Sequence, residues 1–139
     1  DKRSICGHSM GGHGALTIAL KNVDKYQSVS AFSPITNPMK CPWGQKAFTA
    51  YLGRNTESWK AYDSCELMKE AKATLPMLID QGTSDDFLKE QLKPEALSQV
   101  AVDMGYPLEL RYHNGYDHSY YFMASFIEDH LKFHAKYLT

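Results

Sequence analysis

A chain of 139 residues with 43% hydrophobic residues has the length and composition of one soluble globular domain. Its formal net charge of −1 gives no electrostatic reason to expect a nucleic acid or an anionic membrane surface as a partner. No apolar stretch approaches the ~18 residues needed to cross a bilayer, so the sequence predicts no membrane span.

The first elements are a strand and a helix on either side of a glycine-rich run. Residues 2–6 are predicted to form a short buried strand that gives way to the run 7–14. Apolar residues at helical spacing follow over 15–20. Residues 28–32 are apolar and β-branched, which indicates a second strand that ends before Pro34.

An irregular segment is expected next, because Pro34, Pro38 and Pro42 follow one another closely. Weakly helical segments then cover 45–52 and 57–72.

The remaining elements alternate regularly between strand and helix. Residues 76–80 predict a third strand, and the apolar stripe of 94–104 predicts a helix that ends at Gly105. Residues 108–112 alternate as a fourth strand, and a long helix covers 119–138.

This alternation predicts a mostly parallel sheet with helices on both faces, a doubly wound α/β fold of the α/β-hydrolase type. The chain lacks an initial methionine and begins one strand before its most demanding turn. We therefore expect residues 1–139 to form the C-terminal half of a single domain whose N-terminal half is missing.

The turn Gly7-His8-Ser9-Met10-Gly11 fits G-x-S-x-G, the nucleophile elbow of α/β-hydrolases. In an elbow the serine hydroxyl stands above the sheet at a helix N-terminus, where the Met10 N–H can stabilise an oxyanion. Both flanking positions are glycine because we expect side chains there to collide with neighbouring backbone. An ordinary glycine-rich turn is the alternative, but a strand before and a helix after favour an elbow with Ser9 as nucleophile.

Candidates for the acid and the base follow the third and fourth strands. α/β-Hydrolases use the chain order serine, acid, histidine. Asp85 and Asp86 follow the third strand and His118 follows the fourth, so these side chains are expected at the carboxyl edge of the sheet. Asp85 is favoured because it stands three residues after Gly82, and Asp86 stays open. Asp117 is expected to point away from its neighbour His118.

The other histidines are expected to have structural roles. His8 is predicted to pack beneath the elbow with both nitrogens hydrogen-bonded. His130 and His134 have an i, i+4 spacing that can bind zinc, but no third ligand accompanies them, so an exposed helical face is predicted. The sequence therefore predicts no metal and no cofactor.

Three cysteines, Cys6, Cys41 and Cys65, leave one unpaired in any disulfide scheme. A reducing compartment fits this better than secretion, so a cytoplasmic location is expected. A homodimer is left open.

Longer runs of the sequence are more specific than the elbow pattern. They are Gly7–Leu16, Ser30–Ile35, Asn37-Pro38, Cys41–Gly44, Lys46–Phe48, Tyr51–Gly53, Trp59–Asp63, Leu78–Gly82 and Gly115–Phe122. Together these runs, which span nearly the whole chain, resemble S-formylglutathione hydrolase, also called esterase D.

The resemblance implies a cytosolic, cofactor-independent thioesterase. It would cleave S-formylglutathione to formate and glutathione, the last step of glutathione-dependent formaldehyde removal, and would also accept small acyl esters. The family's serine, acid and histidine fall on Ser9, Asp85 and His118. An N-terminal half would supply the early strands and a second oxyanion donor. Trp43, in the proline-rich segment, is expected either to shape the substrate pocket or to pack as a core or lid aromatic.

Two other functions stay open. One is a general carboxylesterase or acyl hydrolase of the same fold, since the three catalytic residues alone do not select a thioester. The other is an inactive binding fragment built on the fold.

Overall fold

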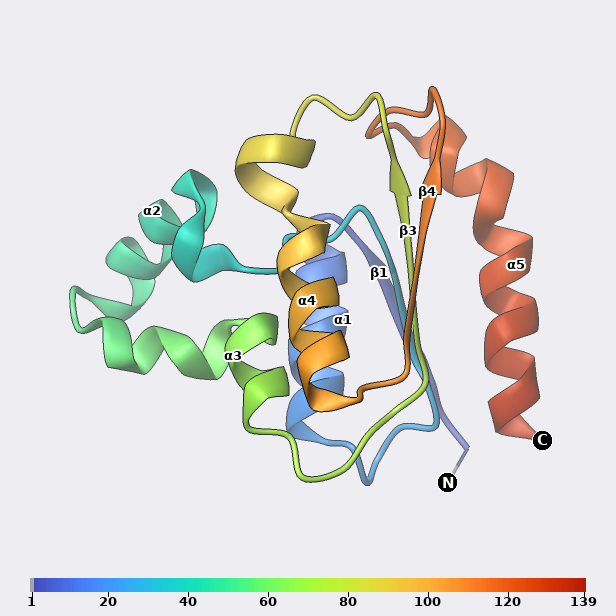
Figure 1. The fold of residues 1–139 in the computed structure, drawn as a ribbon, viewed down its shortest axis with the longest axis horizontal. Helices are drawn as coiled ribbons and strands as arrows, with labels where there is room; N and C mark the ends of the chain where they lie inside the picture. The colour runs from blue at the N-terminus through green and yellow to red at the C-terminus, as the bar shows by residue number, and fades with distance from the viewer. Residues whose placement is uncertain (1) are drawn as a thin grey trace.

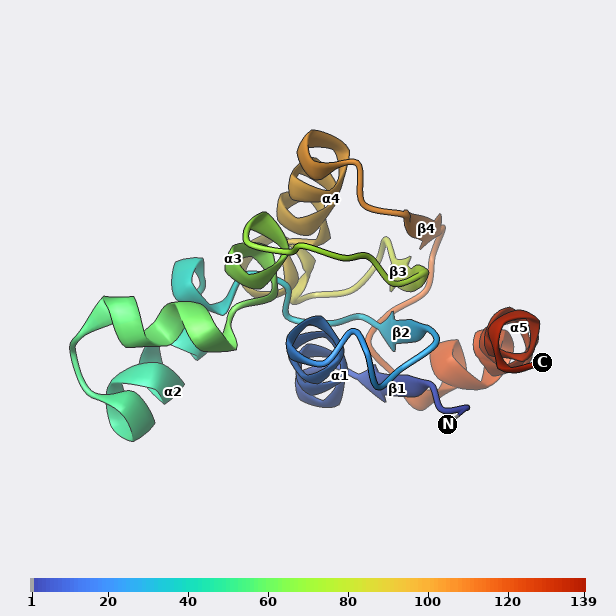
Figure 2. The ribbon, with the colours of Figure 1, turned by 90° about the horizontal axis from the view of Figure 1, so that it is seen from below.

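The structure, a computed structural model, describes residues 2–139 and contains one four-stranded parallel sheet in the order β1-β2-β3-β4. Helices α1, α3 and α4 cover one face of the sheet and α5 alone covers the other (Figures 1 and 2). The predicted α/β fold with a parallel sheet and helices on both faces is confirmed. The elements are β1 (Ile5–His8), α1 (Met10–Lys21), β2 (Val29–Phe32), η1 (Pro38–Lys40), α2 (Pro42–Leu52), η2 (Thr56–Tyr62), α3 (Ser64–Lys69), β3 (Met77–Gly82), η3 (Leu88–Leu92), α4 (Pro94–Met104), β4 (Leu108–His113) and α5 (Tyr120–Leu138).

The first strand and the predicted helix over 57–72 differ from expectation. Strand β1 starts later and runs to His8, because this part of the backbone pairs in register with β2 up to Phe32. The region 57–72 is broken at Asp63 into a 3-10 turn and the short helix α3. The Asp63 carboxylate accepts a hydrogen bond from the backbone N–H of Glu66 at 3.1 Å, which starts a new helix instead of continuing the old one.

The parallel register brings the carboxyl ends of the strands to one edge. His8 pairs with Phe32, and Gly82 pairs with His113. The turn after β1 and the loops after β3 and β4 therefore leave the sheet at the same edge, where ligand sites of open parallel sheets are found.

The two faces of the sheet differ in chemistry. Under α1 and α4 lies a continuous apolar core in which Leu16, Val29, Ile79 and Leu97 are almost fully buried. Burial of such side chains contributes about 1.5–3 kcal/mol each. The face under α5 instead buries several polar side chains, among them Asp80.

A segment between β2 and α3 leaves the sheet and carries η1, α2 and η2. It projects beside α1 and forms the part of the molecule farthest from α5 (Figure 1). We call residues 33–63 the excursion. Its first part contains the irregular segment predicted around Pro34 and Pro38, and α2 covers the predicted helix 45–52 but begins earlier, at Pro42.

Candidate active site

Ser9 sits in a tight turn between β1 and α1, with φ 58° and ψ −114°. Positive φ is uncommon for a non-glycine residue, and here the surrounding backbone holds it: the Ser9 amide donates to the carbonyl of Phe32 at 2.9 Å. A Cβ at Gly7 would lie 2.1 Å from the carbonyl oxygen of Gly11, so that position requires glycine. Among residues 2–139, a Cβ at Gly11 would have no neighbour within 4 Å. For these residues the expectation that both glycines avoid a collision is therefore wrong at Gly11.

Ser9, His118 and Asp85 form a hydrogen-bonded chain. His118 Nε2 lies 2.9 Å from Ser9 Oγ, and His118 Nδ1 lies 2.7 Å from Asp85 Oδ2. Because a carboxylate only accepts hydrogen bonds, Nδ1 carries the proton and Nε2 is free to accept the serine hydroxyl hydrogen. This is the geometry by which a histidine can act as general base toward a nucleophilic serine.

The Asp85 carboxylate is buried and held by several donors. Its Oδ1 accepts from the Phe87 backbone N–H at 2.9 Å, and its Oδ2 also accepts from the Gln81 side-chain amide at 3.2 Å. Burial alone would raise the pKa of Asp85, but the hydrogen bonds from His118 and Phe87 outweigh it and lower that pKa below its usual value. The carboxylate therefore stays ionised at neutral pH beside the imidazole.

The other acidic candidates lie elsewhere. Asp86 is exposed, one residue beyond the buried Asp85. The carboxylate of Asp117 accepts a hydrogen bond from the backbone N–H of Ser119, the residue before α5, at 2.9 Å. Asp117 points away from its neighbour, and the structure brings only Asp85 to His118.

The loops that carry Asp85 and His118 are joined by backbone contacts. The Ser84 N–H donates to the Tyr116 carbonyl at 2.9 Å, and the Gly115 N–H donates to Thr83 Oγ1 at 3.0 Å. A Cβ at Gly82 would lie 2.2 Å from that same Tyr116 carbonyl oxygen. This close approach requires glycine and fixes the spacing of the two loops.

The Met10 backbone N–H is the first of helix α1. Amides in the first turn of a helix have no intrahelical partner, and the helix dipole places partial positive charge there. The first α-helical hydrogen bond of α1 runs from the His13 N–H to the Ser9 carbonyl at 3.0 Å. The Met10 N–H is therefore in the position predicted for an oxyanion donor.

His8 contacts His118, which the sequence did not indicate. Its ring centroid lies 4.9 Å from that of His118 and 5.9 Å from that of Tyr120. His8 Nε2 is buried without a hydrogen-bond partner in the described chain, so the expectation that both nitrogens are satisfied is wrong. Burial, and next the electrostatic repulsion by His118 when that ring is protonated, lower the pKa of His8 and so favour its neutral form.

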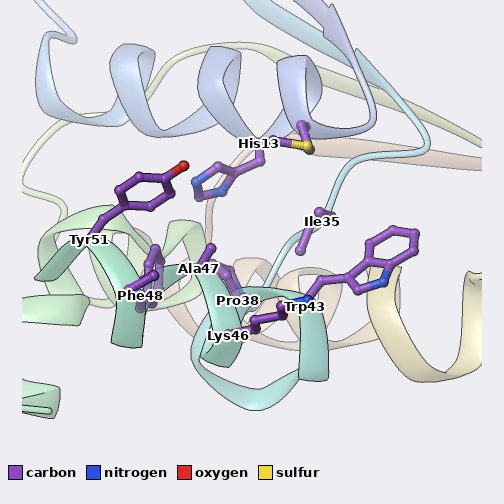
Figure 3. A pocket seen from close by; sticks show the side chains of 11 residues that line it. His13, Ile35, Pro38, Trp43, Lys46, Ala47, Phe48 and Tyr51 are labelled. Carbon is purple, nitrogen blue, oxygen red and sulfur yellow. The ribbon is translucent and has the colours of Figure 1, made fainter. Parts of the chain in front are cut away.

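A cavity of about 420 Å³ opens between the start of α1 and helix α2. Trp43 and Tyr51 stand toward its two ends, with His13 and Ile35 between them (Figure 3). The Trp43 ring lies 4.6 Å from the Phe87 ring, which in turn meets His118 edge-on at 5.2 Å. Trp43 thus lines the cavity and also packs against the loop that carries Asp85, so it has a feature of each expectation.

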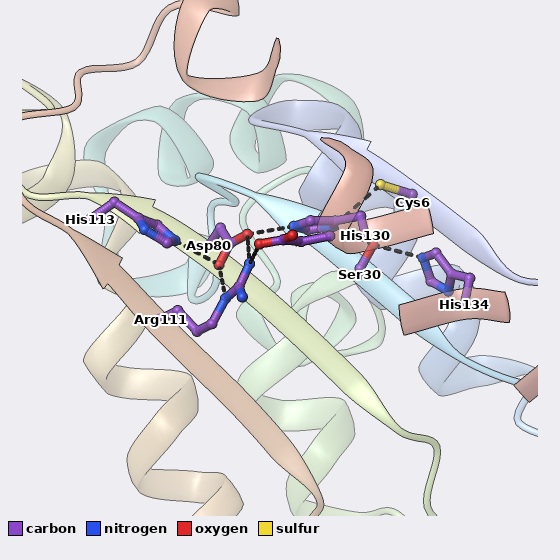
Figure 4. Close-up of polar contacts among 8 residues, drawn as sticks. Cys6, Ser30, Asp80, Arg111, His113, His130 and His134 are labelled. Atoms are coloured by element: carbon purple, nitrogen blue, oxygen red, sulfur yellow. Dashed lines mark hydrogen bonds and ion pairs between the residues drawn. The ribbon is translucent and has the colours of Figure 1, made fainter. Parts of the chain in front are cut away.

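His130 and His134 are buried, which overturns the expectation of an exposed helical face. They face the sheet from α5 and meet polar groups there (Figure 4). His130 bonds Asp80 and Ser30, each at 2.7 Å, and His134 bonds Ser30 at 2.8 Å. The i, i+4 pair is therefore part of a buried hydrogen-bond network.

A comparison with protein families finds a match over residues 1–133 to the esterase family model, described as "Putative esterase". The chain belongs to the esterase family. It is 57% identical over 138 residues to an S-formylglutathione hydrolase of Arabidopsis thaliana, an alignment that covers 99% of this chain and 49% of that relative. The chain spans about half the length of the curated relative it matches.

Solved structures give the same result. An S-formylglutathione hydrolase from Agrobacterium tumefaciens matches with a TM-score of 0.93 and 47% identity, covering 98% of this chain and 49% of that one. A fluorophosphonate-binding serine hydrolase from Staphylococcus aureus matches with a TM-score of 0.76 and 24% identity, covering 94% of this chain and 53% of that one. The second likeness shows a shared fold. Among the helices described here, none is long and apolar enough to cross a membrane.

Proposed function

We propose that this chain carries the catalytic residues of a serine thioesterase that cleaves S-formylglutathione to formate and glutathione. The observation that carries the proposal is the hydrogen-bonded chain from Ser9 through His118 to Asp85, with contacts of 2.9 and 2.7 Å. The thioester substrate is suggested by the 57% identity to an S-formylglutathione hydrolase.

In this proposal Ser9 Oγ attacks the formyl carbon while His118 Nε2 takes the hydroxyl proton. The negative charge that forms on the carbonyl oxygen is stabilised by the Met10 N–H. Asp85 holds the imidazole tautomer and stabilises the imidazolium. The tetrahedral intermediate then collapses and expels glutathione as a thiol that takes its proton from His118. Water, activated by the same histidine, releases formate and frees the serine.

The direct test is covalent labelling followed by substitution. A fluorophosphonate probe should label Ser9 in the full encoded protein, meaning the whole product of the transcript that contains this sequence, and mass spectrometry identifies the site. Ser9→Ala should abolish labelling and turnover. A label on another residue, or full activity in Ser9→Ala, would falsify the proposal.

We further propose that Trp43 forms one wall of the substrate pocket, because it lines the cavity next to Met10. Trp43→Ala should raise KM for S-formylglutathione. A matched control is Tyr62→Ala, a more distant aromatic of the excursion that is also partly exposed. If Trp43→Ala lowers only the melting temperature and leaves KM unchanged, Trp43 is a packing residue.

The proposed enzyme needs more chain than these residues. In the described residues β1 pairs only with β2, so its other edge has free N–H and C=O groups, which favour aggregation. One oxyanion donor alone would also cost roughly 10²–10³ in rate. We propose that residues 1–139 are the C-terminal half of one α/β-hydrolase domain, and that an N-terminal half supplies strands beside β1 and a second donor.

A complementation experiment tests this dependence. The 139-residue chain alone should be aggregation-prone and almost inactive. Co-expression with the N-terminal half of the A. thaliana relative should restore solubility and thioesterase activity. A soluble, cooperatively melting chain of this length with full turnover would show that the domain is complete without a partner segment.

A general carboxylesterase is the second candidate, because the catalytic geometry acts equally on oxyesters. The ratio of kcat/KM for S-formylglutathione to that for a simple acetate ester separates the two functions. Any turnover that depends on Ser9 rules out the third candidate, an inactive binding fragment. We also propose a cytoplasmic location, since Cys6, Cys41 and Cys65 are all free thiols.

A further inference from the structure

A single carboxylate collects most of the buried polar contacts under α5. Asp80, on β3, is fully buried and is bonded by His113, Arg111 and His130 (Figure 4). Its Oδ1 lies 2.9 Å from His113 Nε2 and its Oδ2 lies 2.7 Å from His130 Nε2. Arg111 donates to both oxygens, from Nε at 2.6 Å and from Nη2 at 2.7 Å.

This carboxylate is ionised and acts only as an acceptor. Burial alone would raise the pKa of Asp80, but the hydrogen bonds from His130, Arg111 and His113 outweigh it and hold that pKa far below its usual range. Since an ionised carboxylate has no proton to donate, both histidines point an N–H at it. Each of its contacts is therefore a charge-assisted hydrogen bond.

The two histidines lie on either side of His118 in the chain. His113 is the last residue of β4, and His130 lies within α5, whose first turn follows His118 directly. Asp80 thus fastens both ends of the segment 113–130, which carries the catalytic histidine. Asp80 also lies on the strand that leads to Asp85.

Aromatic packing fixes the two histidine rings independently of the carboxylate. The His113 ring stacks on Phe126 at 3.7 Å between centroids, and the His130 ring stacks on Phe32 at 3.8 Å. A phenylalanine at position 113 can keep the ring contact and lose only the hydrogen bond to Asp80. A phenylalanine at position 130 can also keep its ring contact, but it loses the hydrogen bond to Ser30 together with the one to Asp80. The structure therefore allows each end of the segment to be released separately.

We propose that Asp80 is a positioning residue for the catalytic residues: by binding His113 and His130 it sets the place of His118 between Ser9 and Asp85. This inference rests on the proposed function, because it takes those three residues as catalytic. We call Asp80, His113 and His130 the clamp. His118 must keep its 2.9 Å contact with Ser9 Oγ and its 2.7 Å contact with Asp85 Oδ2 at the same time. A displacement of the ring near 1 Å can therefore cost about 10²-fold in rate.

The test uses three single variants and one double variant of the full encoded protein. Asp80→Asn should lower kcat for S-formylglutathione on the order of 10²-fold and change KM by less than about twofold. His113→Phe and His130→Phe should each lower kcat by a smaller factor. The double Phe variant should fall well short of the product of the two single effects, because releasing either end already frees the segment.

A spectroscopic readout separates positioning from a loss of stability. The His118 Nδ1 proton, hydrogen-bonded to Asp85, should give a downfield proton NMR signal in the wild type, assigned by its loss in His118→Ala. That signal should broaden or disappear in the clamp variants while the protein stays folded. If Asp80→Asn does not fold, the two Phe variants decide the matter.

Two control variants change residues outside the clamp. Asp129→Asn removes a second, partly exposed carboxylate that binds Arg111: Arg111 Nη2 donates to Asp129 Oδ2 at 3.2 Å. Leu97→Ala destabilises the apolar core on the opposite face. Both should keep kcat within about twofold at temperatures below their unfolding transitions.

Two results would overturn the proposal that the clamp positions His118. One is an unchanged NMR signal and kcat in both Phe variants, and the other is an equal loss of kcat in Leu97→Ala. Neither result touches the proposed function, which fails instead if Ser9→Ala keeps full activity. If the wild type turns over no glutathione thioester, the rate of Ser9 labelling by the fluorophosphonate probe replaces kcat in every comparison.

Discussion

The elbow glycine Gly7 offers a sharp test of how Ser9 is held. In Gly7→Ala the new Cβ would lie 2.1 Å from the Gly11 carbonyl oxygen, whereas real Cβ contacts essentially never fall below 3.0 Å. The backbone at the start of α1 must therefore move by about 0.9 Å or more. The nearest atoms that the new Cβ would meet all belong to the backbone of Gly11 and Gly12, so no flexible side chain can absorb the shift.

This displacement acts on stability and on catalysis together. Overpacking a rigid site costs about 1–3 kcal/mol, and a backbone clash places this variant near about 3 kcal/mol. The same displacement moves Ser9 Oγ away from His118 Nε2, now at 2.9 Å, and a misplacement of this size lowers kcat on the order of 10²-fold.

Gly11→Ala is the matched control, since its Cβ meets nothing within 4 Å and the position lies in helix α1. Alanine in a helix is favoured over glycine by roughly 0.5–1 kcal/mol, so this variant should be neutral or slightly stabilised. Urea unfolding of both variants of the full encoded protein measures the stability, and steady-state kinetics measures kcat. Equal stability and equal kcat in the two variants would refute the reasoning about the elbow.

Three further predictions concern the acid, a neighbouring histidine and pH. Asp85→Asn should lower kcat on the order of 10⁴-fold, by analogy with the serine-protease aspartate, while Asp86→Asn should have little effect; kinetics showing the reverse order would move the role to Asp86. His8→Phe should keep at least roughly a tenth of wild-type kcat/KM, because the base that contacts Ser9 is His118; a collapse of activity to the level of His118→Ala would contradict this. The lowered pKa of Asp80 means that its stabilisation is present above the unfolded value of about 3.9 and is lost as pH falls through the folded pKa. In urea titrations the difference in free energy of unfolding between wild type and Asp80→Asn should therefore narrow below about pH 4. A difference that widens there would contradict the expected direction of this pH dependence.

Helix α4 shows where the local sequence was sufficient to predict the bounds of an element. The predicted range 94–104 is the observed one, because Pro94 suits the first helical turn and Gly105 ends the helix with φ 65°. The order of strands and helices could equally be predicted, since β2 and β3 are mostly apolar runs and β4 alternates between apolar and polar residues. The candidate catalytic residues could be selected for the same reason, as each follows a strand end.

The network under α5 was missed because a polar helix face was taken as exposed. His130 and His134 are polar, and periodicity alone assigns such positions to solvent. The signal that could have found them lies on the strands: Ser28 and Ser30 alternate on one face, and Asp80 interrupts an otherwise apolar run. Polar residues inside strands predicted to be buried require partners, and the histidines of the only long helix left for that face could supply them.

The contact between His8 and His118 depends on tertiary structure. One residue precedes the serine, the other follows β4, and the register of four strands brings them together. Gly7 and Gly11 likewise look equivalent in the motif, and only the path of α1 distinguishes the crowded position from the open one.

The excursion has a consequence for how substrate preference can change. Residues 33–63 supply most of the cavity wall, yet Ser9, Asp85 and His118 all lie outside them. Backbone contacts join the two loops that carry Asp85 and His118, and the excursion takes no part in those contacts. One uninterrupted stretch of chain can therefore be lengthened, shortened or exchanged to admit a different acyl or leaving group while the three residues proposed as catalytic stay where they are. An exchange of α2 and its flanking turns between relatives is accordingly the simplest way to change the ester preference of the proposed enzyme.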